Sequence, residues 1–453
     1  MASVSVVTLG CPKNLVDAEV MSGFLRQEGF DLTRDLDAAS VVVVNTCSFI
    51  EESKTESIDR ILELAALKEG GACRLLAVTG CLAQRYADEL AKELPEVDLF
   101  VGTGEYHRLP ALISEGLRDK GQSIAVGPPR WLPGDETPRI LGTHRYSAYL
   151  KVSEGCSRPC TFCIIPRLRG SNRSRDIESL VREARRLADE GTTELNLIAQ
   201  DLTDFRKDLR EERGLERLLR ALAEIERLRW IRCLYLYPDG ISSELVALLS
   251  GEARICSYAD MPIQHVSDSV LVAMRRAGGE RTVRASVERL RAAGVAVRTT
   301  VITGFPGETD ADFRRLHDFV AEGHFTHLGA FPYSDEEGTR AFALEHRVPR
   351  EEAEARRAAL MELQQGISHA RNTALVGRTV EVLCEGGSEE TDLLLRGRTA
   401  LQAPEIDGGV FITSGNLEPG EYVDVRITDA HPYDLVGEPI TMPLRGADQF
   451  PVI

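Results

Sequence analysis

Three cysteines lie close together between Gly155 and Gly170 in a CxxxCxxC spacing: Cys156, Cys160 and Cys163. Cysteine thiolates bind zinc and iron–sulfur clusters, and a complete structural zinc site or an electron-carrying cluster normally takes four such ligands. Three thiolates therefore leave one metal position open for chemistry. The alternative is a zinc knuckle without its fourth ligand, but a loop rich in Gly, Pro and Arg suits a metal cradle better than buried core thiols.

Three more cysteines each follow an apolar run near the amino terminus. The runs are Val4–Leu9, Val41–Asn45 and Leu75–Thr79, and the cysteines are Cys11, Cys47 and Cys81. Strands that alternate with helices predict a doubly wound α/β domain, in which the loops after parallel strands emerge at the same edge of the sheet. We therefore expect these three thiols to converge on a second metal site.

Several longer motifs accompany the two cysteine sets. They are Leu9-Gly-Cys-Pro-Lys-Asn-Leu-Val-Asp17, Asn45-Thr-Cys-Ser-Phe-Ile50, Thr79-Gly-Cys-Leu-Ala-Gln84, Met261-Pro-Ile-Gln-His265 with Met274-Arg-Arg276, and Phe331-Pro-Tyr-Ser-Asp-Glu-Glu-Gly-Thr339. Together they resemble the methylthiotransferase family of radical S-adenosylmethionine (SAM) enzymes over nearly the whole chain. Pro12-Lys-Asn and the Ser-Asp-Glu-Glu-Gly-Thr run most resemble the branch that acts on a ribosomal protein (RimO type), rather than the branches that act on tRNA.

The resemblance implies two 4Fe-4S clusters, one on each cysteine set. The cluster on Cys156, Cys160 and Cys163 would bind SAM and, with an electron from a donor such as flavodoxin or ferredoxin, cleave it to a 5'-deoxyadenosyl radical. The cluster on Cys11 and its two partners would carry the sulfur that a second SAM methylates. The expected product is a methylthio group on the β-carbon of an aspartate in ribosomal protein S-twelve, either free or within the small ribosomal subunit.

Six apolar runs after residue 142 predict the strands of the central part. They are Ala148–Val152, Glu194–Ala199, Ile231–Tyr235, Tyr258–Met261, Val297–Ile302 and His327–Phe331, with helices such as Ile177–Asp189 and Asp310–Glu322 between them. This alternation suggests a partial (βα)6 barrel, the architecture usual for radical SAM domains, with function at the carboxyl ends of the strands. Candidate SAM-binding residues are Phe162, Gln200, Gln264, Arg298 and Gly304. We expect His265 to be an orienting or core group rather than a ligand.

Short strands follow the helix predicted for Arg350–Asn372. They are Thr379–Cys384, Asp392–Gly397, Val410–Ile412 and Tyr422–Thr428, and they suggest a small β-barrel that resembles the TRAM module of methylthiotransferases. The predicted domains are 1–127 for the amino-terminal cluster domain, 128–141 for a Pro-rich linker, 142–372 for the radical SAM partial barrel and 373–442 for the TRAM barrel.

Charge favours a basic protein over nucleic acid as the partner. The chain has a formal net charge of −17, from 54 basic and 71 acidic residues. Between Thr373 and Met442 the only basic residues, apart from a histidine, are Arg378, Arg396, Arg398 and Arg426, against thirteen acidic residues. Such a surface repels phosphates, so we expect no direct binding of nucleic acid. Two alternatives stay open: a tRNA adenosine 2-methylthiotransferase, and a non-enzymatic iron–sulfur or zinc scaffold.

The remaining sequence features indicate a cytoplasmic protein. No uninterrupted apolar run reaches about 18 residues, so no membrane-spanning helix is expected, and the amino terminus has no basic leader. Ten cysteines in a chain of this type indicate metal or redox work rather than disulfides. The four outside the two sets, Cys73, Cys233, Cys256 and Cys384, are expected to be small buried hydrophobic residues.

Overall fold

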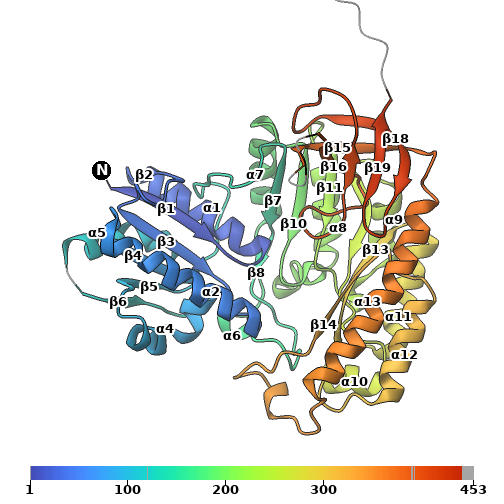
Figure 1. The fold of residues 1–453 in the computed structure, drawn as a ribbon, viewed down its shortest axis with the longest axis horizontal. Coiled ribbons are helices and arrows are strands. Elements are labelled where there is room, and N and C mark those ends of the chain that lie inside the picture. The colour runs from blue at the N-terminus through green and yellow to red at the C-terminus, as the bar shows by residue number, and fades with distance from the viewer. Residues whose placement is uncertain (1, 120, 389–390, 392, 441–453) are drawn as a thin grey trace, which may run out of the picture.

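The structure is a computed structural model that describes residues 2–119, 121–388, 391 and 393–440. Within these residues it contains two six-stranded sheets, a closed barrel and a two-stranded ribbon. In Figure 1 the amino-terminal sheet lies at the left in blue, and the closed barrel lies at the upper right in red, with the second six-stranded sheet between them.

The amino-terminal sheet is entirely parallel. Its elements are β1 (Ser3–Thr8), α1 (Pro12–Gln27), β2 (Asp31–Leu32), β3 (Val41–Thr46), α2 (Glu51–Ala65), α3 (Leu67–Gly70), β4 (Leu75–Gly80), α4 (Cys81–Glu93), β5 (Leu99–Val101), η1 (Tyr106–Arg108), α5 (Leu109–Arg118) and β6 (Ser123–Ala125). The strand order is β2-β1-β3-β4-β5-β6, so the order reverses direction between β1 and β3. In open α/β sheets, ligands bind outside the carboxyl ends of the strands at such a switch point.

The valines of β3 show why this sheet needs helices on both faces. Val42 and Val44 pack into a core with α2 and α4, whereas Val41 and Val43 pack into a second core with α1 and α5. Successive side chains of a strand point to opposite faces, so an unbroken apolar run is buried only when both faces are covered. The predicted doubly wound α/β domain is therefore confirmed. Sequence-based reasoning missed the short strands β2, β5 and β6.

The central sheet is also entirely parallel, with the order β14-β13-β12-β11-β10-β7. Its strands are β7 (Ser147–Lys151), β10 (Glu194–Ile198), β11 (Trp230–Cys233), β12 (Ile255–Asp260), β13 (Ala296–Thr303) and β14 (His327–Pro332). Its helices are α6 (Ile165–Leu168), α7 (Ile177–Asp189), α8 (Gly214–Ala223), α9 (Ser243–Gly251), α10 (Asp268–Ala273), α11 (Gly279–Ala292), α12 (Asp310–Ala321) and α13 (Arg350–Thr373), with the short turns η2 (Leu202–Asp204), η3 (Lys207–Leu209), η4 (Pro238–Gly240) and η5 (Ala341–Ala343).

The largest core lies between this sheet and its helices. Side chains such as Leu150, Leu197, Ile231 and Val297 point outward to the helices, and Figure 1 shows α11, α12 and α13 beside β13 and β14. The inner face of the sheet instead contributes Tyr149, Trp230 and Tyr258 to a smaller core that also includes residues of α1 and of the carboxyl-terminal barrel. The predicted partial barrel of six βα units is confirmed.

The carboxyl-terminal part is a closed barrel of five strands with the order β15-β16-β17-β19-β18. The strands are β15 (Thr379–Gly387), β16 (Leu395–Arg398), β17 (Val410–Ile412), β18 (Tyr422–Ala430) and β19 (Leu435–Pro439). The β-barrel prediction is confirmed, although β19 was missed. Asp392, where the second predicted strand begins, and residues 441 and 442, where the predicted domain ends, lie outside the described residues.

A buried charge pair fixes this barrel onto the central sheet. Arg398 of β16 donates through Nη1 to Oε1 of Glu194 at the start of β10, at 2.6 Å, and Nη2 pairs with the other oxygen of the same carboxylate. Arg232 of β11 lies 3.2 Å from Oε1. All three side chains are almost fully buried, so the barrel closes one side of the inner face of the sheet.

The Pro-rich connector packs against both neighbouring parts of the protein. Trp131 lies against the rings of Phe24 and His107 in the amino-terminal part. Arg139, almost fully buried, pairs with Glu19 of α1 and Glu183 of α7. The connector thereby joins α1 to the central part.

Candidate cysteine-rich active site

The three amino-terminal cysteines follow neighbouring strands. Cys11 follows β1 and is the N-cap of α1, Cys47 follows β3, and Cys81 opens α4 directly after β4. Because β3 lies between β1 and β4, the three loops meet at one edge of the sheet. The backbones are close: a Cβ atom added to Gly10 would lie 2.8 Å from the Cβ and 3.2 Å from the Sγ of Cys47. A glycine at this position lets the first loop pass against the second.

Electrostatics also place the three thiols near one another. Burial raises the pKa of Cys81 to about 11; the Arg169 guanidinium opposes this rise, and the thiols of Cys47 and Cys11 add to it. Burial, followed by the neighbouring Cys11, raises the pKa of Cys47. A buried thiol of this kind stays protonated at neutral pH unless a cation compensates the thiolate charge. Three such sulfur donors fit a soft metal centre such as an iron–sulfur cluster.

Hydrogen bonds from side chains hold the three loops together. The side-chain Nδ2 of Asn14 donates to the main-chain carbonyls of Leu9 and Thr46, both at 3.0 Å. The main-chain carbonyl of Asn14 accepts from Nδ2 of Asn45 at 2.7 Å. Thr46 Oγ1 donates to the carbonyl of Thr79 at 2.6 Å. The carbonyls of Leu9, Thr46 and Thr79 precede the three cysteines by one or two residues. The hydrogen-bond network therefore positions the backbone that leads into each cysteine.

Several buried polar atoms around these loops have no hydrogen-bond partner among the residues that the structure describes. They are Asn45 Oδ1, Ser48 Oγ, Thr79 Oγ1 and Tyr106 Oη. An unpaired buried polar group costs free energy, so a cluster of them indicates a place for a further hydrogen-bonding group. The sulfides of an iron–sulfur cluster accept hydrogen bonds, and hydroxyl groups such as those of Ser48, Thr79 and Tyr106 can donate them. The surroundings of Cys11, Cys47 and Cys81 therefore fit such a cluster.

The second cysteine loop is closed at its base by a two-stranded ribbon. Strand β8 (Ser153–Glu154) pairs antiparallel with β9 (Arg173–Ser174), and the Cys156 N–H donates to the carbonyl of Gly170 at 3.0 Å. Gly155 has φ +80°, and a Cβ atom there would lie 2.3 Å from the carbonyl oxygen of Ser171. Only glycine fits this left-handed, crowded position, so the approach to Cys156 depends on Gly155.

Guanidinium and backbone donors surround the second set of thiols. The Arg158 N–H donates to Sγ of Cys156 at 3.4 Å, and Nη1 of Arg276 lies 3.9 Å from Sγ of Cys160. Burial raises the pKa of Cys156 to about 11 and that of Cys163 to about 12. Donors aimed at sulfur favour the thiolate form that binds metal. This donor set also fits an iron–sulfur cluster with three protein ligands.

Three of the five predicted SAM-binding residues lie around this loop or at the carboxyl ends of the strands. Phe162 packs edge-on to Phe305, with 6.5 Å between the ring centroids. Gln200 follows β10 and donates through Nε2 to Glu154 at 3.0 Å, while its buried Oε1 has no hydrogen-bond partner within the described part of the chain. Gln264 has φ +69° and donates its N–H to a carbonyl of β13. Their contact with SAM stays a prediction.

The other two predicted SAM-binding residues have clear structural partners. Gly304 has φ +71°, and a Cβ atom there would lie 2.3 Å from the Cβ of Ala353 in α13, so this glycine allows α13 to pack closely. Arg298 lies 2.9 Å from Asp260 and 3.3 Å from Asp407 of the carboxyl-terminal part. These ion pairs give Arg298 a role in seating the barrel, and its predicted role at the SAM carboxylate stays a prediction.

Sequence-based reasoning missed a buried ion-pair network between the two cysteine sets. Lys151 pairs with Asp17 and lies 2.7 Å from Glu154, and Arg169 lies 2.9 Å from Asp17 and 3.2 Å from Glu154. All four side chains are less than one-tenth exposed. Arg169 stands inside the same Gly- and Arg-rich segment as Cys156, which was the available signal, but nothing in the sequence pairs it with α1.

The two cysteine sets themselves are neighbours. Cys81 packs with Ile164, which directly follows Cys163, and with Leu168 at the end of α6. Among the described residues, no three His, Cys, Asp or Glu side chains are grouped as ligands of a single metal ion. The cysteines of a 4Fe-4S cluster bind different irons, so their sulfurs stand further apart than the ligands of one ion.

The cysteines outside the two sets and His265 are buried, as expected. These cysteines are Cys73, Cys233, Cys256 and Cys384.

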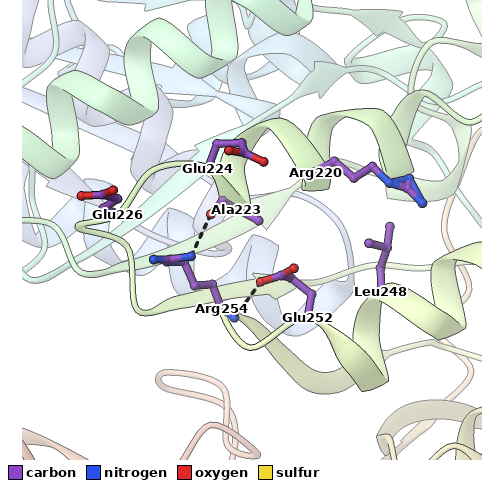
Figure 2. A pocket seen from close by; sticks show the side chains of 7 residues that line it. All are labelled: Arg220, Ala223, Glu224, Glu226, Leu248, Glu252 and Arg254. Atoms are coloured by element: carbon purple, nitrogen blue, oxygen red, sulfur yellow. Dashed lines mark hydrogen bonds between the residues drawn. The ribbon is translucent and has the colours of Figure 1, made fainter.

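A pocket of about 450 Å³ lies elsewhere, between α8 and α9. Figure 2 shows its charged lining, with Arg254 donating to the carbonyl of Ala223. Arg254 directly precedes β12, so the pocket lies at the amino ends of the strands, opposite the edge that carries Cys156. In barrels of βα units that amino-terminal face contributes stability rather than chemistry.

None of the described helices is both long and apolar enough to cross a membrane.

Comparisons with known proteins divide the chain in the same order as the fold. Residues 3–102 match the model of the uncharacterized protein family UPF0004, residues 150–320 match that of the radical SAM superfamily, and residues 376–440 match that of the TRAM domain. Among solved structures, the radical SAM methyltransferase TsrM from Kitasatospora setae, with tryptophan and a SAM analog bound, is 16% identical with a TM-score of 0.53, covering 73% of each chain. At this identity the likeness establishes the fold alone.

Full-length relatives are much more similar. The ribosomal protein uS12 methylthiotransferase RimO of Citrifermentans bemidjiense is 49% identical over 96% of this chain and 98% of its own length. That of Geotalea uraniireducens is 51% identical over the same shares of the two chains, and that of Myxococcus xanthus is 47% identical over 97% of this chain and 92% of its own. With this identity over nearly the whole length, the chain belongs to the RimO family of methylthiotransferases within the radical SAM superfamily.

Proposed function

We propose that this protein adds a methylthio group to the β-carbon of an aspartate in ribosomal protein S-twelve (uS12) of the small ribosomal subunit. The observation that carries the proposal is that the two three-cysteine sets are neighbours: Cys81 of one set packs with Ile164 and Leu168, which follow Cys163 of the other set along the chain. Each set would hold a 4Fe-4S cluster with three protein ligands and would leave the fourth position to SAM or to a sulfur species. Methylthiolation needs both a sulfur donor and a carbon radical at the same substrate atom, and adjacent open sites suit that requirement.

Cys11, Cys47 and Cys81 would hold one cluster, and Cys156, Cys160 and Cys163 the other. When bound, the clusters and SAM supply the sulfur, the methyl group and the radical. The protein positions them: Asn14 holds the amino-terminal loops, and the β8–β9 ribbon closes the second loop. The domain boundaries that we propose follow this division: residues 1–127 would deliver sulfur, 142–372 would cleave SAM, 373–442 would recruit the substrate, and 128–141 would be the connector.

The exposed charges of the barrel support a basic protein as substrate. Arg398 is buried against Glu194 and is therefore absent from the surface. Arg378 and Arg426 are exposed. The exposed acidic side chains of the described barrel residues are Glu405, Glu418, Glu421, Asp424, Asp429 and Glu438. Acidic surfaces speed encounter with Lys- and Arg-rich partners and oppose binding of a phosphate backbone. Ribosomal proteins are partners of that chemistry, and a small flavodoxin- or ferredoxin-like electron donor in the cytoplasm completes the system.

The test is an anaerobic assay with both candidate substrates present. The protein, reconstituted with iron and sulfide, receives SAM, a reductant, ribosomal protein S-twelve and tRNA, and mass spectrometry locates the methylthio increment. An increment on the aspartate supports the proposal. An increment on tRNA adenosine would overturn the substrate assignment, and absence of 5'-deoxyadenosine would leave the scaffold alternative.

Two cysteine variants separate the roles of the two sets. We expect Cys156→Ala to abolish formation of 5'-deoxyadenosine. Cys47→Ala should keep 5'-deoxyadenosine formation but lose methylthio transfer, because only the sulfur-carrying site is damaged. Cys73→Ala is the matched control, since Cys73 is buried in the same domain but lies outside the three loops. Methylthio transfer by Cys47→Ala at the rate of the control would contradict the two-site assignment.

A further inference from the structure

The buried ion-pair network between the two cysteine sets contains one side chain that contacts both. Arg169 follows α6 and is 2% exposed. It reaches the amino-terminal domain through Asp17 and the central domain through Glu154, at 2.9 Å and 3.2 Å. With Lys151 the group holds two positive and two negative charges. Because buried charges are costly unless paired, the four side chains favour one mutual arrangement.

On the amino-terminal side, Arg169 connects to the loops that carry the thiols. Its Nη2 donates to Oδ1 of Asn14 at 2.6 Å. Nδ2 of the same amide holds the carbonyls of Leu9 and Thr46. Asn14 can use its oxygen for Arg169 and its nitrogen for the two loops at the same time, so the guanidinium also sets the orientation of the amide. Arg169 is therefore one side chain away from the backbones that lead into Cys11 and Cys47.

On the other side, Arg169 connects to the approach to Cys156. Glu154, its partner, accepts the N–H of Gly155 at 3.2 Å through Oε1. The residue after Arg169, Gly170, accepts the Cys156 N–H. Glu154 Oε1 also accepts from Gln200 at 3.0 Å, at the carboxyl end of β10. A shift of Arg169 would therefore move the backbone on both sides of the junction.

We propose that Arg169 is a positioning residue that sets the distance and orientation between the two cysteine sets, and thereby couples SAM cleavage to methylthio transfer. The proposal builds on the proposed function. A guanidinium suits this task because its planar, rigid fork donates to Asn14, Asp17 and Glu154 in fixed directions. A lysine keeps the charge but lacks the fork, so it cannot hold all three partners.

The experiment compares Arg169→Lys and Asn14→Asp with a matched control. Asn14→Asp preserves size and an acceptor for Arg169 but removes the donor to the Leu9 and Thr46 carbonyls. Arg139→Lys is the control, because Arg139 also joins α1 to the central domain through two carboxylates, Glu19 and Glu183, away from the cysteine loops. Two quantities are measured: methylthio product per 5'-deoxyadenosine in the reconstituted proteins, and hydrogen–deuterium exchange of residues 9–14 and 45–48 in the cluster-free proteins.

We expect Arg169→Lys and Asn14→Asp to form 5'-deoxyadenosine while product per 5'-deoxyadenosine falls by about 10- to 100-fold, the effect of a small misplacement of reacting groups. Exchange in both loop segments should be faster, and the Arg139→Lys control should match wild type. A merely structural loss would lower both products together. If Arg169→Lys does not fold, the product ratio and the exchange rates of Asn14→Asp decide whether the proposal holds.

The proposal is overturned if the foldable variants keep the wild-type ratio and exchange, or if Arg139→Lys shows the same fall in ratio. The proposed function can fail separately. If the wild-type protein cleaves SAM without modifying ribosomal protein S-twelve, the substrate assignment is wrong, and the exchange comparison still tests the role of Arg169.

Discussion

Replacing Arg398 with methionine should loosen the carboxyl-terminal barrel from the central sheet. Arg398 contributes two of the hydrogen bonds that reach the Glu194 carboxylate, and both side chains are almost fully buried. Methionine keeps much of the length and apolar contact of the arginine stem but leaves the carboxylate with Arg232 as its one remaining cationic partner among the described residues. The main loss therefore falls on the contact between the two domains, together with the 2.7 Å pair that Arg398 makes with Glu385 inside the barrel.

The size of the effect can be worked out from Glu194. Burial raises its pKa, but the guanidinium groups of Arg398 and Arg232 and their hydrogen bonds outweigh burial and hold the pKa at about 2, below the ordinary 4.5. At about 1.4 kcal/mol per pH unit, this net difference, to which both guanidinium groups and Ser147 contribute, corresponds to about 3 kcal/mol. Removing one partner of a buried ion pair costs about 3–5 kcal/mol, which agrees. Because the folded-state pKa is lowered, this stability is present above about pH 4.5 and is lost as the pH falls toward about 2.

The assay is urea unfolding combined with limited proteolysis of the segment that joins α13 to β15. The control is Arg426→Met, since Arg426 forms an exposed 3.7 Å pair with Glu438 in the same barrel, and exposed pairs contribute about 0–1 kcal/mol. Arg398→Met should lower the unfolding free energy by about 3 kcal/mol near pH 7, speed cleavage of the joining segment, and differ less from wild type at acidic pH. Equal effects of the two substitutions would refute the reasoning.

Two further perturbations address the amino-terminal junction and a buried histidine. Glu336 is 2% exposed and lies 3.2 Å from Lys54 and 2.9 Å from Arg85 of the amino-terminal domain. Glu336→Gln should therefore lower the unfolding free energy by about 1.5–3 kcal/mol, whereas the control Glu337→Gln, at an exposed position, should change it little. Thermal unfolding compares the two variants, and equal unfolding midpoints would contradict the assignment. Burial lowers the pKa of His265 to about 4. Between about pH 4 and 6.5 the unfolded chain therefore binds more protons than the folded protein. The free energy of unfolding should fall by about 3 kcal/mol as the pH decreases over that interval. His265→Asn should abolish that part of the pH dependence, and an unchanged profile in urea titrations would show that other groups cause it.

Much of the fold could be read from periodicity alone. Strands β3 and β4 each open with four consecutive apolar residues and are buried at every position, because both faces of the parallel sheet are covered, so their predicted lengths came close to the structure. Helix α7 was predicted at its observed bounds, Ile177–Asp189, and in the structure the side chain of Asp176 caps its start. The short strands were harder: β2 has only two residues, and β19 carries Gly437, which weakens a strand pattern.

The chemistry-bearing cysteines were also accessible from the sequence. A thiol after each of three predicted parallel strands has to reach the same edge, because the topology allows no other exit. Charged side chains were less predictable. From the sequence, Arg298 was predicted to bind SAM near the strand ends. In the structure its guanidinium pairs with Asp260 and with Asp407, which is more than one hundred residues later in the sequence.

The sequence by itself determined the ligand types, their grouping in threes, the alternation of strands and helices, and the family motifs, because these are properties of residue order and local spacing. Only the tertiary structure decided how the groups meet. Asn14, Arg169 and Glu154 are separated by up to 155 residues, and Arg398 reaches Glu194 across 204. Pairing of buried charges depends on which surfaces the folded domains bring together, and no local pattern encodes that choice.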